Sequence, residues 1–511
     1  MATAIKTERA SAGNERAFSA GLALMFCALL VAGIALLLNS DLTQSFPYLY
    51  LLPWIIALFV LLTVPTAILY YKGRLTLYDP LVYATWSFFF PSFVIGGVML
   101  MAGWSQPYFL SFIQDAEYNL PYSIILIMLG YAGLAAGYFS PFGSRLGSII
   151  GAKLPTRDFD TSALLWPGLF LLILGTFNTV AALFLGIVGY QRSEVIDSYS
   201  GIVFLTTLFW MQGTFILWYI IFRRGKLEFR SGMLVALLFL VTIGKALLSG
   251  NRAALLQVFI IVLLAFLLAG GKFNFRRTAA AGVVLSVCLI AGMIYGTTFR
   301  RVKGSEAQVS MDEYAEDIFE TLDQLGRFDL GKSLDLALMG LAERLDTLSS
   351  VAVVVSNYEQ LAPYEESYGL DDNIWKDLST FLVPRIIWNE KPIASEPRKY
   401  SDLYFNYGEN SFAITPIADL LRNYGPYGVP IGMFLFGIVI RFIYRALIEN
   451  QRRTVWRATM YFMLIMAISY EGFYGLLIPF LFKAGITAIV GLLIVGLIAR
   501  GLGHQRVPEP V

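Results

Sequence analysis

The chain has 511 residues, of which 57% are hydrophobic, 15% are aromatic and only 14% are charged, and its net charge is +2. A soluble domain carries nearer a quarter charged residues, so the composition excludes an ordinary soluble protein and predicts a polytopic membrane protein. Cys27 and Cys288 both lie inside apolar runs, and the only histidine, His504, lies in the C-terminal tail. No disulfide framework or thiolate metal site follows from the two cysteines, and the position of the histidine excludes a histidine metal site.

Residues 1–17 are polar, and they are predicted to form a disordered tail. The apolar run that follows continues for about 20 residues, which predicts a spanning helix and not a cleaved signal peptide. Similar runs recur along the chain and predict an all-α polytopic membrane protein with about 12 transmembrane helices. The predicted spans are Phe18–Leu38, Tyr48–Tyr71, Leu81–Gly103, Pro121–Ser140, Ala163–Gly189, Gly201–Phe222, Ser231–Leu248, Ala253–Gly270, Thr278–Thr298, Gly428–Ala446, Trp456–Tyr470 and Leu476–Ala499.

Basic residues gather in alternate connections between these spans. One set of flanks includes Lys72 and Arg74, whereas the opposite short loops hold little beyond Arg192 and Arg252. By the positive-inside rule, both termini (residues 1–17 and 500–511) are predicted to be cytoplasmic. We therefore expect a multi-pass protein of a bacterial inner membrane.

A long polar insert, Phe299–Tyr427, separates the first nine predicted spans (residues 18–298) from the last three (residues 428–499). The predicted orientation places this insert in the periplasm. Met311–Gly326 and Lys332–Leu361 read as amphipathic helices within it, and an irregular, proline-rich stretch begins after Pro363. Fixed loops on a rigid scaffold often carry binding and catalytic groups, so we expect the site in this insert.

Several cations stand at the predicted outer face, where the positive-inside rule disfavours them. Guanidinium groups grip phosphate with paired hydrogen bonds, so these cations predict an anionic ligand. The alternative interpretation is structural: the cations anchor helix ends or pair with acids such as Glu471. The cations are Arg252, Arg300, Arg301, Arg344, Arg385, Lys391 and Arg422, together with Lys245 and Lys483 inside apolar runs.

The candidate general bases in this region are the carboxylates Asp402, Glu409, Asp419 and Glu471. Asp419 lies three residues before Arg422, which places both side chains on one face of a helix. Aromatic residues are also frequent here, and they fit either stacking against sugars or an interfacial belt. The sequence contains no phosphate-binding loop or nucleophile elbow, and its basic flanks do not indicate a nucleic-acid partner.

Three segments carry a resemblance: SGNRAALLQ around Arg252, VPRIIWNEKP around Arg385, and ITPIADLLRNYGPYGVPIGMFLFG around Arg422. Together with the predicted topology, they resemble the Wzy-type O-antigen (oligosaccharide repeat-unit) polymerases. The resemblance implies an architecture like that of GT-C glycosyltransferases. One departure is Asp419, since glutamate is the more usual acid before the last of these motifs.

The resemblance also implies a reaction and its partners. A growing glycan on undecaprenyl pyrophosphate would be transferred to a lipid-linked repeat unit, with no cofactor or metal, alongside a flippase and a chain-length regulator. The resemblance assigns stabilisation of the pyrophosphate charge to Arg252, Arg385 and Arg422, with help from Lys391. We expect Arg344 and Arg300 to support this charge, and Asp419, Glu409 or Glu471 to orient or deprotonate the acceptor.

Three other functions remain open from the sequence. A flippase for lipid-linked sugars would also need cations and aromatic residues, but along a central path. An O-antigen ligase is less consistent with this chain, because those enzymes are understood to use an external histidine. A non-catalytic subunit of an export complex would use the insert as a docking surface.

Overall fold

The computed structural model describes residues 46–103, 107–185, 187, 200–224, 229–249, 254–272, 275–303, 311–326, 345–385, 387–392, 394–408 and 412–501. Within these ranges every regular element is a helix and there is no strand. The predicted all-α fold class is confirmed for this part of the chain.

The elements follow one another in chain order. The first group consists of η1 (Leu49–Leu51), α3 (Leu52–Tyr71), α4 (Pro80–Ala84), η2 (Thr85–Ile95), α5 (Gly96–Met101), α6 (Pro107–Leu110), α7 (Ala116–Phe139) and α8 (Pro141–Lys153). The second consists of α9 (Leu165–Phe184), α10 (Ser200–Thr207), α11 (Phe209–Arg224), α12 (Phe229–Ser249), α13 (Ala254–Leu268), α14 (Phe275–Lys303) and α15 (Met311–Gly326). The third consists of α17 (Thr347–Leu361), η3 (Ala362–Tyr364), α18 (Asn373–Thr380), α19 (Pro397–Phe405), α20 (Pro416–Leu447), α21 (Val455–Met466), η4 (Tyr474–Leu476) and α22 (Leu477–Gly501).

Eight helical segments among the described residues are long and apolar enough to cross a membrane. The protein is therefore a multi-pass membrane protein by the length and composition of its helices. These segments are Leu49–Tyr71, Pro80–Met101, Ala116–Phe139, Leu165–Phe184, Gly201–Arg224, Gly282–Lys303, Pro416–Leu447 and Tyr474–Gly501.

Three further apolar helices coincide with predicted spans but are shorter: Gly232–Leu248, Leu255–Leu268 and Val455–Met466. At about 1.5 Å of rise per residue, the last of these is too short to cross a hydrocarbon core of about 30 Å by itself. The first predicted span, Phe18–Leu38, lies outside the described residues. The total of twelve spans therefore stays a prediction.

The insert is more helical than its proline content suggests. The predicted helix Met311–Gly326 is confirmed as α15. The predicted helix Lys332–Leu361 is described only in its second part, where α17 begins at Thr347 after the N-cap Asp346. Helix α14 extends past the predicted boundary at Phe299 to Lys303.

Helix α20 begins at Pro416, twelve residues before the predicted span at Gly428. The predicted boundary corresponds to a break, because Gly425 has φ 68° and ψ −170° inside this helix. Such a conformation suits glycine and interrupts the helical hydrogen bonds, so the first turns of α20 are set apart from its membrane part. At the N-terminus, Thr415 adopts φ 63° and its hydroxyl accepts a hydrogen bond from Ala418 N.

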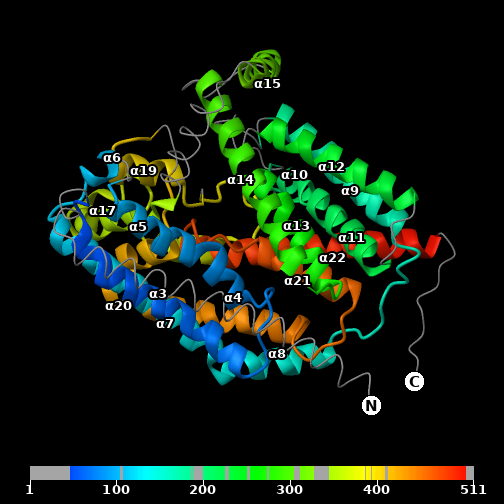
Figure 1. Ribbon diagram of the computed structural model, residues 1–511, viewed down its shortest axis with the longest axis horizontal. Helices are drawn as coiled ribbons and strands as arrows, with labels where there is room; N and C mark the ends of the chain where they lie inside the picture. The colour runs from blue at the N-terminus through cyan, green and yellow to red at the C-terminus, as the bar shows by residue number, and fades with distance from the viewer. Residues whose placement is uncertain are drawn as a thin grey trace.

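Helix α20 makes a close contact with two consecutive helices, α7 and α8, along the lower side of the view in Figure 1. Glycines of α7 and α8 face carbonyl oxygens of α20 at every fourth residue, which is one stripe of a helix. A Cβ atom at any of these glycines would overlap α20 or press against it. The pairs are Gly133 with Pro430, Gly137 with Phe434, Gly143 with Ile438, Gly147 with Phe442 and Gly151 with Ala446.

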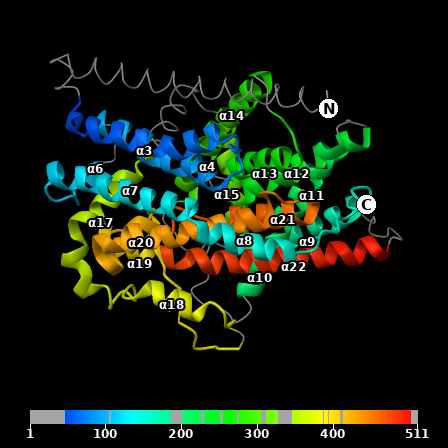
Figure 2. The same cartoon turned by 90° about the horizontal axis from the view of Figure 1, so that it is seen from below.

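This stripe fixes the two ends of α20 relative to the rest of the bundle. Small residues let membrane helices approach closely. Van der Waals packing then holds the helices together, because lipid provides no hydrophobic driving force between them. One end of α20 meets α17 and η4, whereas the other lies beside α8. Figure 2 shows α18 at the edge of the molecule, by the first turns of α22.

We predict that Gly137→Ala destabilises the protein by about 1–3 kcal/mol, because the added methyl group overpacks the contact with Phe434. The matched control is Gly244→Ala in α12, where a Cβ would meet no atom within 4 Å. Thermal unfolding of both variants in detergent checks this. An equal midpoint for the two variants would show that the α7–α20 contact is not tight.

Candidate functional site

The predicted arginine of the third motif, Arg422, is fully buried at the start of α20. Its Nη1 donates hydrogen bonds to Glu365 Oε2 at 2.8 Å and to the carbonyl oxygen of Leu370 at 2.9 Å. Its Nη2 donates to Asp419 Oδ1 at 2.8 Å and to Asn373 Oδ1. One guanidinium group therefore joins α20 to the segment between α17 and α18.

Asp419 is the second member of this network. Its Oδ1 accepts from Arg422, and its Oδ2 accepts the backbone N–H of Tyr474 at 2.8 Å and that of Gly475 at 3.4 Å. The predicted placement of Asp419 and Arg422 on one helix face is confirmed. Both oxygens of this buried carboxylate are occupied, so Asp419 holds η4 against α20.

Glu365 completes the buried ion cluster. It accepts hydrogen bonds from Arg422 and, at 2.8 Å, from the hydroxyl of Tyr404 in α19. Burial raises the pKa of Glu365, although the neighbouring guanidinium of Arg422 opposes this shift. Two carboxylates against one guanidinium form a structural cluster with its charges directed at one another.

A chain of hydrogen bonds leads from this cluster to α18. The amide of Asn373, whose oxygen binds Arg422, donates from Nδ2 to Ser395 Oγ at 2.8 Å. Ser395 in turn donates from Oγ to Asp377 Oδ2 at 2.7 Å. Burial raises the pKa of Asp377 to about 6, against the effect of the Ser395 hydrogen bonds, and the charge of Lys483 also lowers it.

Three cations gather beside Asp377. Burial and the positive charges of Lys483 and Arg385 lower the pKa of Lys391, whereas Asp377 raises it. Lys391 Nζ donates to the carbonyl oxygen of Val383 at 2.9 Å. Arg385 donates to the carbonyl oxygens of Asn389 and Pro392, both at 3.3 Å.

These hydrogen bonds close the 383–392 turn, and we call Arg385, Lys391 and Lys483 the cation cluster. In the described part of the chain none of the three forms an ion pair at contact distance. Positive charges that interact in this way favour an anion among them.

Apolar side chains surround the cation cluster at the surface. Ile387 is 76% exposed and Leu382 is 59% exposed, and Trp388 is exposed beside them. The ring of Phe381 packs edge-on against Phe482 of α22, at 5.1 Å between centroids. This ring contact joins the segment before the cation cluster to α22, which is long and apolar enough to cross a membrane.

The other predicted residues are placed as follows. Arg252, Arg344 and Glu409 lie outside the described residues. Arg300 is half-buried in the last turn of α14, the helix that packs against α15. Glu471 is half-buried, and its carbonyl oxygen accepts a hydrogen bond from Ile414 N.

The two lysines inside apolar runs have different surroundings. Lys245 Nζ lies 3.5 Å from the ring centroid of Trp210, which satisfies its charge by a cation–π contact. Lys483 instead interacts electrostatically with Asp377. The predicted cations therefore include a fully buried structural one, Arg422, and the half-buried cation cluster.

Sequence reasoning missed Asp377, Glu365, Asn373 and Ser395. The segment NIWKDLST offers a signal for Asp377, since its acid is the only one on a short amphipathic helix whose apolar face is buried. Glu365 stands among other acids in PYEES and has no comparable signal.

We predict that Arg422→Gln lowers the free energy of unfolding by about 3–5 kcal/mol, because Glu365 and Asp419 are left as buried charges without a cation. Thermal unfolding in detergent measures this, with Lys399→Gln on the exposed surface of α19 as the control. Adding Glu365→Gln to the variant restores part of the loss. A midpoint equal to that of the control would contradict the structural role of Arg422.

A second prediction concerns Asp377. Because its pKa is raised from 3.8 to about 6, the folded protein prefers the protonated carboxyl, and this contribution to stability is lost as pH rises through that interval. The stability of Asp377→Asn relative to the unaltered protein should therefore improve between about pH 4 and about pH 7. Unfolding midpoints across this range test it. The control is Asp371→Asn, at a partly exposed ion pair with Lys376. A difference that does not change with pH would refute the assignment.

Comparison with curated proteins and with solved structures gave no match. A family model described as a domain of unknown function (DUF8712) matches residues 176–450. The matched segment includes Asp377, Arg385, Lys391 and Arg422, whereas Lys483 lies beyond it. Since this match covers more than half of the sequence, the chain belongs to the DUF8712 family.

Proposed function

We propose that this protein is a membrane-embedded polysaccharide repeat-unit polymerase of the Wzy type, as the three sequence motifs suggest. It transfers a growing glycan from undecaprenyl pyrophosphate to a lipid-linked repeat unit. The observation that carries the proposal is the cation cluster of Arg385, Lys391 and Lys483 among exposed apolar side chains.

This combination suits an amphiphile with an anionic head. None of the described acids forms a contact ion pair with the cation cluster, and a pyrophosphate group would provide such a partner, since hydrogen bonds from a guanidinium and two ammonium groups suit its oxygens. The polyprenyl tail follows the apolar surface of Leu382, Ile387 and Trp388 towards the membrane.

The reaction forms one bond and breaks one. The oxygen of an acceptor sugar hydroxyl attacks the anomeric carbon of the donor glycan, and the bond from that carbon to the pyrophosphate oxygen breaks. The lipid pyrophosphate leaves with the electron pair, and the cation cluster stabilises the added negative charge. The cations supply this stabilisation without a metal ion.

A carboxylate has to take the proton of the acceptor hydroxyl. Asp377 suits this role best among the described acids, because it faces Lys391 and Lys483 and its pKa of about 6 lies near neutral pH. Ser395 hydrogen-bonds to Asp377 and is only half-buried, so its hydroxyl can pass the proton inward. Asp419, one of the three acids predicted for this role, is occupied by Arg422 and two backbone amides.

The buried cluster around Arg422 then acts as a support. It fixes Asn373 and Ser395, and through them Asp377, relative to α20 and η4. Arg422 is thus a positioning residue in this proposal. The positive-inside pattern of the basic flanks supports an inner-membrane location, with the site at the periplasmic face and both termini in the cytoplasm.

The test uses purified protein and a synthetic undecaprenyl-pyrophosphate oligosaccharide, with products separated on a gel. We expect a ladder spaced by whole repeat units, unchanged by EDTA. Arg385→Gln and Lys391→Gln should each lower the rate by about 10²–10³, as the loss of one charge-stabilising donor does. Asp377→Asn should abolish the ladder.

Lys376→Gln is the matched control, because Lys376 sits next to Asp377 in α18 but pairs with Asp371. The unfolding midpoint of each variant is measured beside its activity, which separates lost chemistry from lost structure. Full activity in Arg385→Gln and Lys391→Gln proteins would overturn the proposal. Movement of labelled substrate across vesicles without a ladder would favour a flippase instead, and transfer of finished glycan to a different acceptor would favour a ligase.

A further inference from the structure

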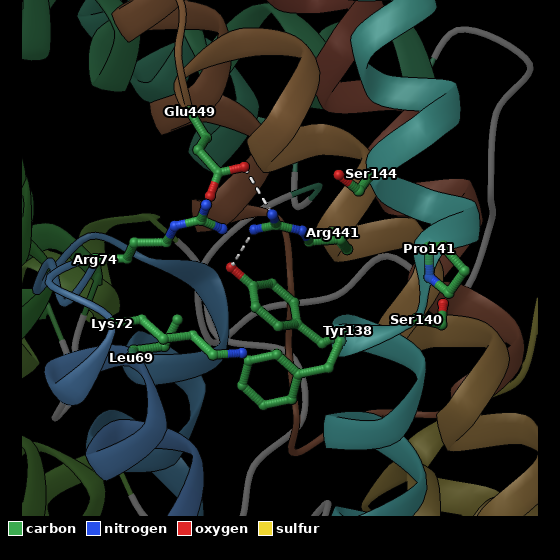
Figure 3. A pocket seen from close by; sticks show the side chains of 10 residues that line it. Leu69, Lys72, Arg74, Tyr138, Ser140, Pro141, Ser144, Arg441 and Glu449 are labelled. Atoms are coloured by element: carbon green, nitrogen blue, oxygen red, sulfur yellow. Dashed lines mark hydrogen bonds and ion pairs between the residues drawn. The ribbon is translucent and has the colours of Figure 1, made fainter.

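A second cationic site lies at the opposite end of the bundle, away from the cation cluster. At this end α3 and α7 finish, α8 begins and α20 finishes, and we call it the basic end because Lys72, Arg74, Arg441 and Arg445 gather there. A pocket of about 250 Å³ opens between these helices (Figure 3). The proposed function assigns no role to it.

The floor of this pocket is a fixed polar network. Arg441 donates to the hydroxyl of Tyr138 at 3.1 Å and to Glu449 Oε2 at 2.7 Å, as the dashed lines in Figure 3 show. Tyr138 in turn donates to the buried carboxylate of Asp79 at 2.5 Å. Arg445 adds a second guanidinium on Glu449, at 3.3 Å. Glu449 is therefore paired with two guanidinium groups, and Asp79 accepts hydrogen bonds from Tyr138 and from the backbone of α4.

Lys72 and Arg74 at the rim are not neutralised. Both side chains are exposed, and in the described part of the chain neither forms an ion pair. Lys72 lies 6.0 Å from the ring centroid of Phe139, which holds it beside the pocket. The first turn of α8, including Ser144, lines another wall, so backbone N–H groups add to the positive potential. The pocket thus keeps two positive charges in excess.

The surface next to the pocket is apolar and exposed. Phe142, Leu146 and Ile149 follow one face of α8 at helical spacing, and each is at least half exposed. Tyr71, at the end of α3, is 85% exposed. Exposed apolar side chains on a helix that begins at a membrane boundary lie against lipid chains.

We propose that this pocket binds the phosphate group of an anionic phospholipid. Lys72 and Arg74 hold the phosphate against the pocket, and the acyl chains lie over Tyr71, Phe142 and Leu146. The volume of about 250 Å³ is below the roughly 300–1,000 Å³ of whole drug-sized ligands, so the pocket takes the headgroup and not the tails. Free phosphate has the same chemistry, and the experiment separates it from lipid.

The full-length protein is kept in mixed micelles, and its unfolding midpoint is followed as phosphatidylglycerol replaces phosphatidylcholine. We expect the midpoint to rise with phosphatidylglycerol. In the Lys72→Gln/Arg74→Gln double variant, the apparent affinity for phosphatidylglycerol should fall about thirtyfold, as the loss of two basic contacts at a lipid surface implies. Lys72→Arg/Arg74→Lys keeps both charges and should respond as the unaltered protein does.

The matched control is Arg145→Gln/Lys153→Gln, which removes two exposed basic residues of α8 outside the pocket lining. A loss of response in this control equal to that of the double variant would mean general attraction to an anionic surface and would overturn the proposal. So would an absent response in the unaltered protein. A midpoint that rises with inorganic phosphate in neutral detergent, but not with phosphatidylglycerol, would assign the pocket to free phosphate and refute the lipid.

Discussion

The close approach of α20 to α7 and α8 is the contact on which both polar ends of the molecule depend. It is made by glycines that meet carbonyl oxygens at every fourth residue of α20, from Pro430 to Ala446. Because this contact is backbone against side-chain-free backbone, α20 cannot slide or rotate without an overlap. The helix carries Arg422 near its first residue and Arg441 near its last, so one packing constraint positions the buried ion cluster at one end and the polar pocket floor at the other.

The two ends use their arginines in the same way. Arg422 and Arg441 are both buried, and both donate hydrogen bonds to carboxylates and polar groups of the protein. These bonds offset the free-energy cost of removing a guanidinium group from water. Among the residues that the structure describes, the cations that we propose for ligands lie outside these clusters: Arg385, Lys391 and Lys483 at one end, and Lys72 and Arg74 at the other. The buried charged networks thus fix the helices relative to one another, while the partly exposed cations on these helices remain able to bind an anionic ligand.

The helices could be predicted from sequence far better than the site. Length and hydropathy were enough for Tyr48–Tyr71 and Leu476–Ala499, because a membrane span has to satisfy its backbone within one continuous apolar segment. Asp419 and Arg422 were correctly paired, since three residues of separation bring two side chains together on a helix. Their partner Glu365 is 57 residues from Arg422, and no local pattern predicts such a contact.

The sequence by itself determined that this chain is an all-α membrane protein with a polar insert near its C-terminal third, because composition and run length are properties of each segment alone. Only the tertiary structure decided which cations are available to bind an anionic ligand. The motif of Arg422 predicted a residue that binds pyrophosphate, but in the fold its guanidinium group is bonded to Glu365, Asn373 and Asp419. Lys483, in an apolar run, was one candidate among many until the fold brought it to Asp377 and Lys391, and charge neighbourhoods of this kind depend on contacts between distant segments.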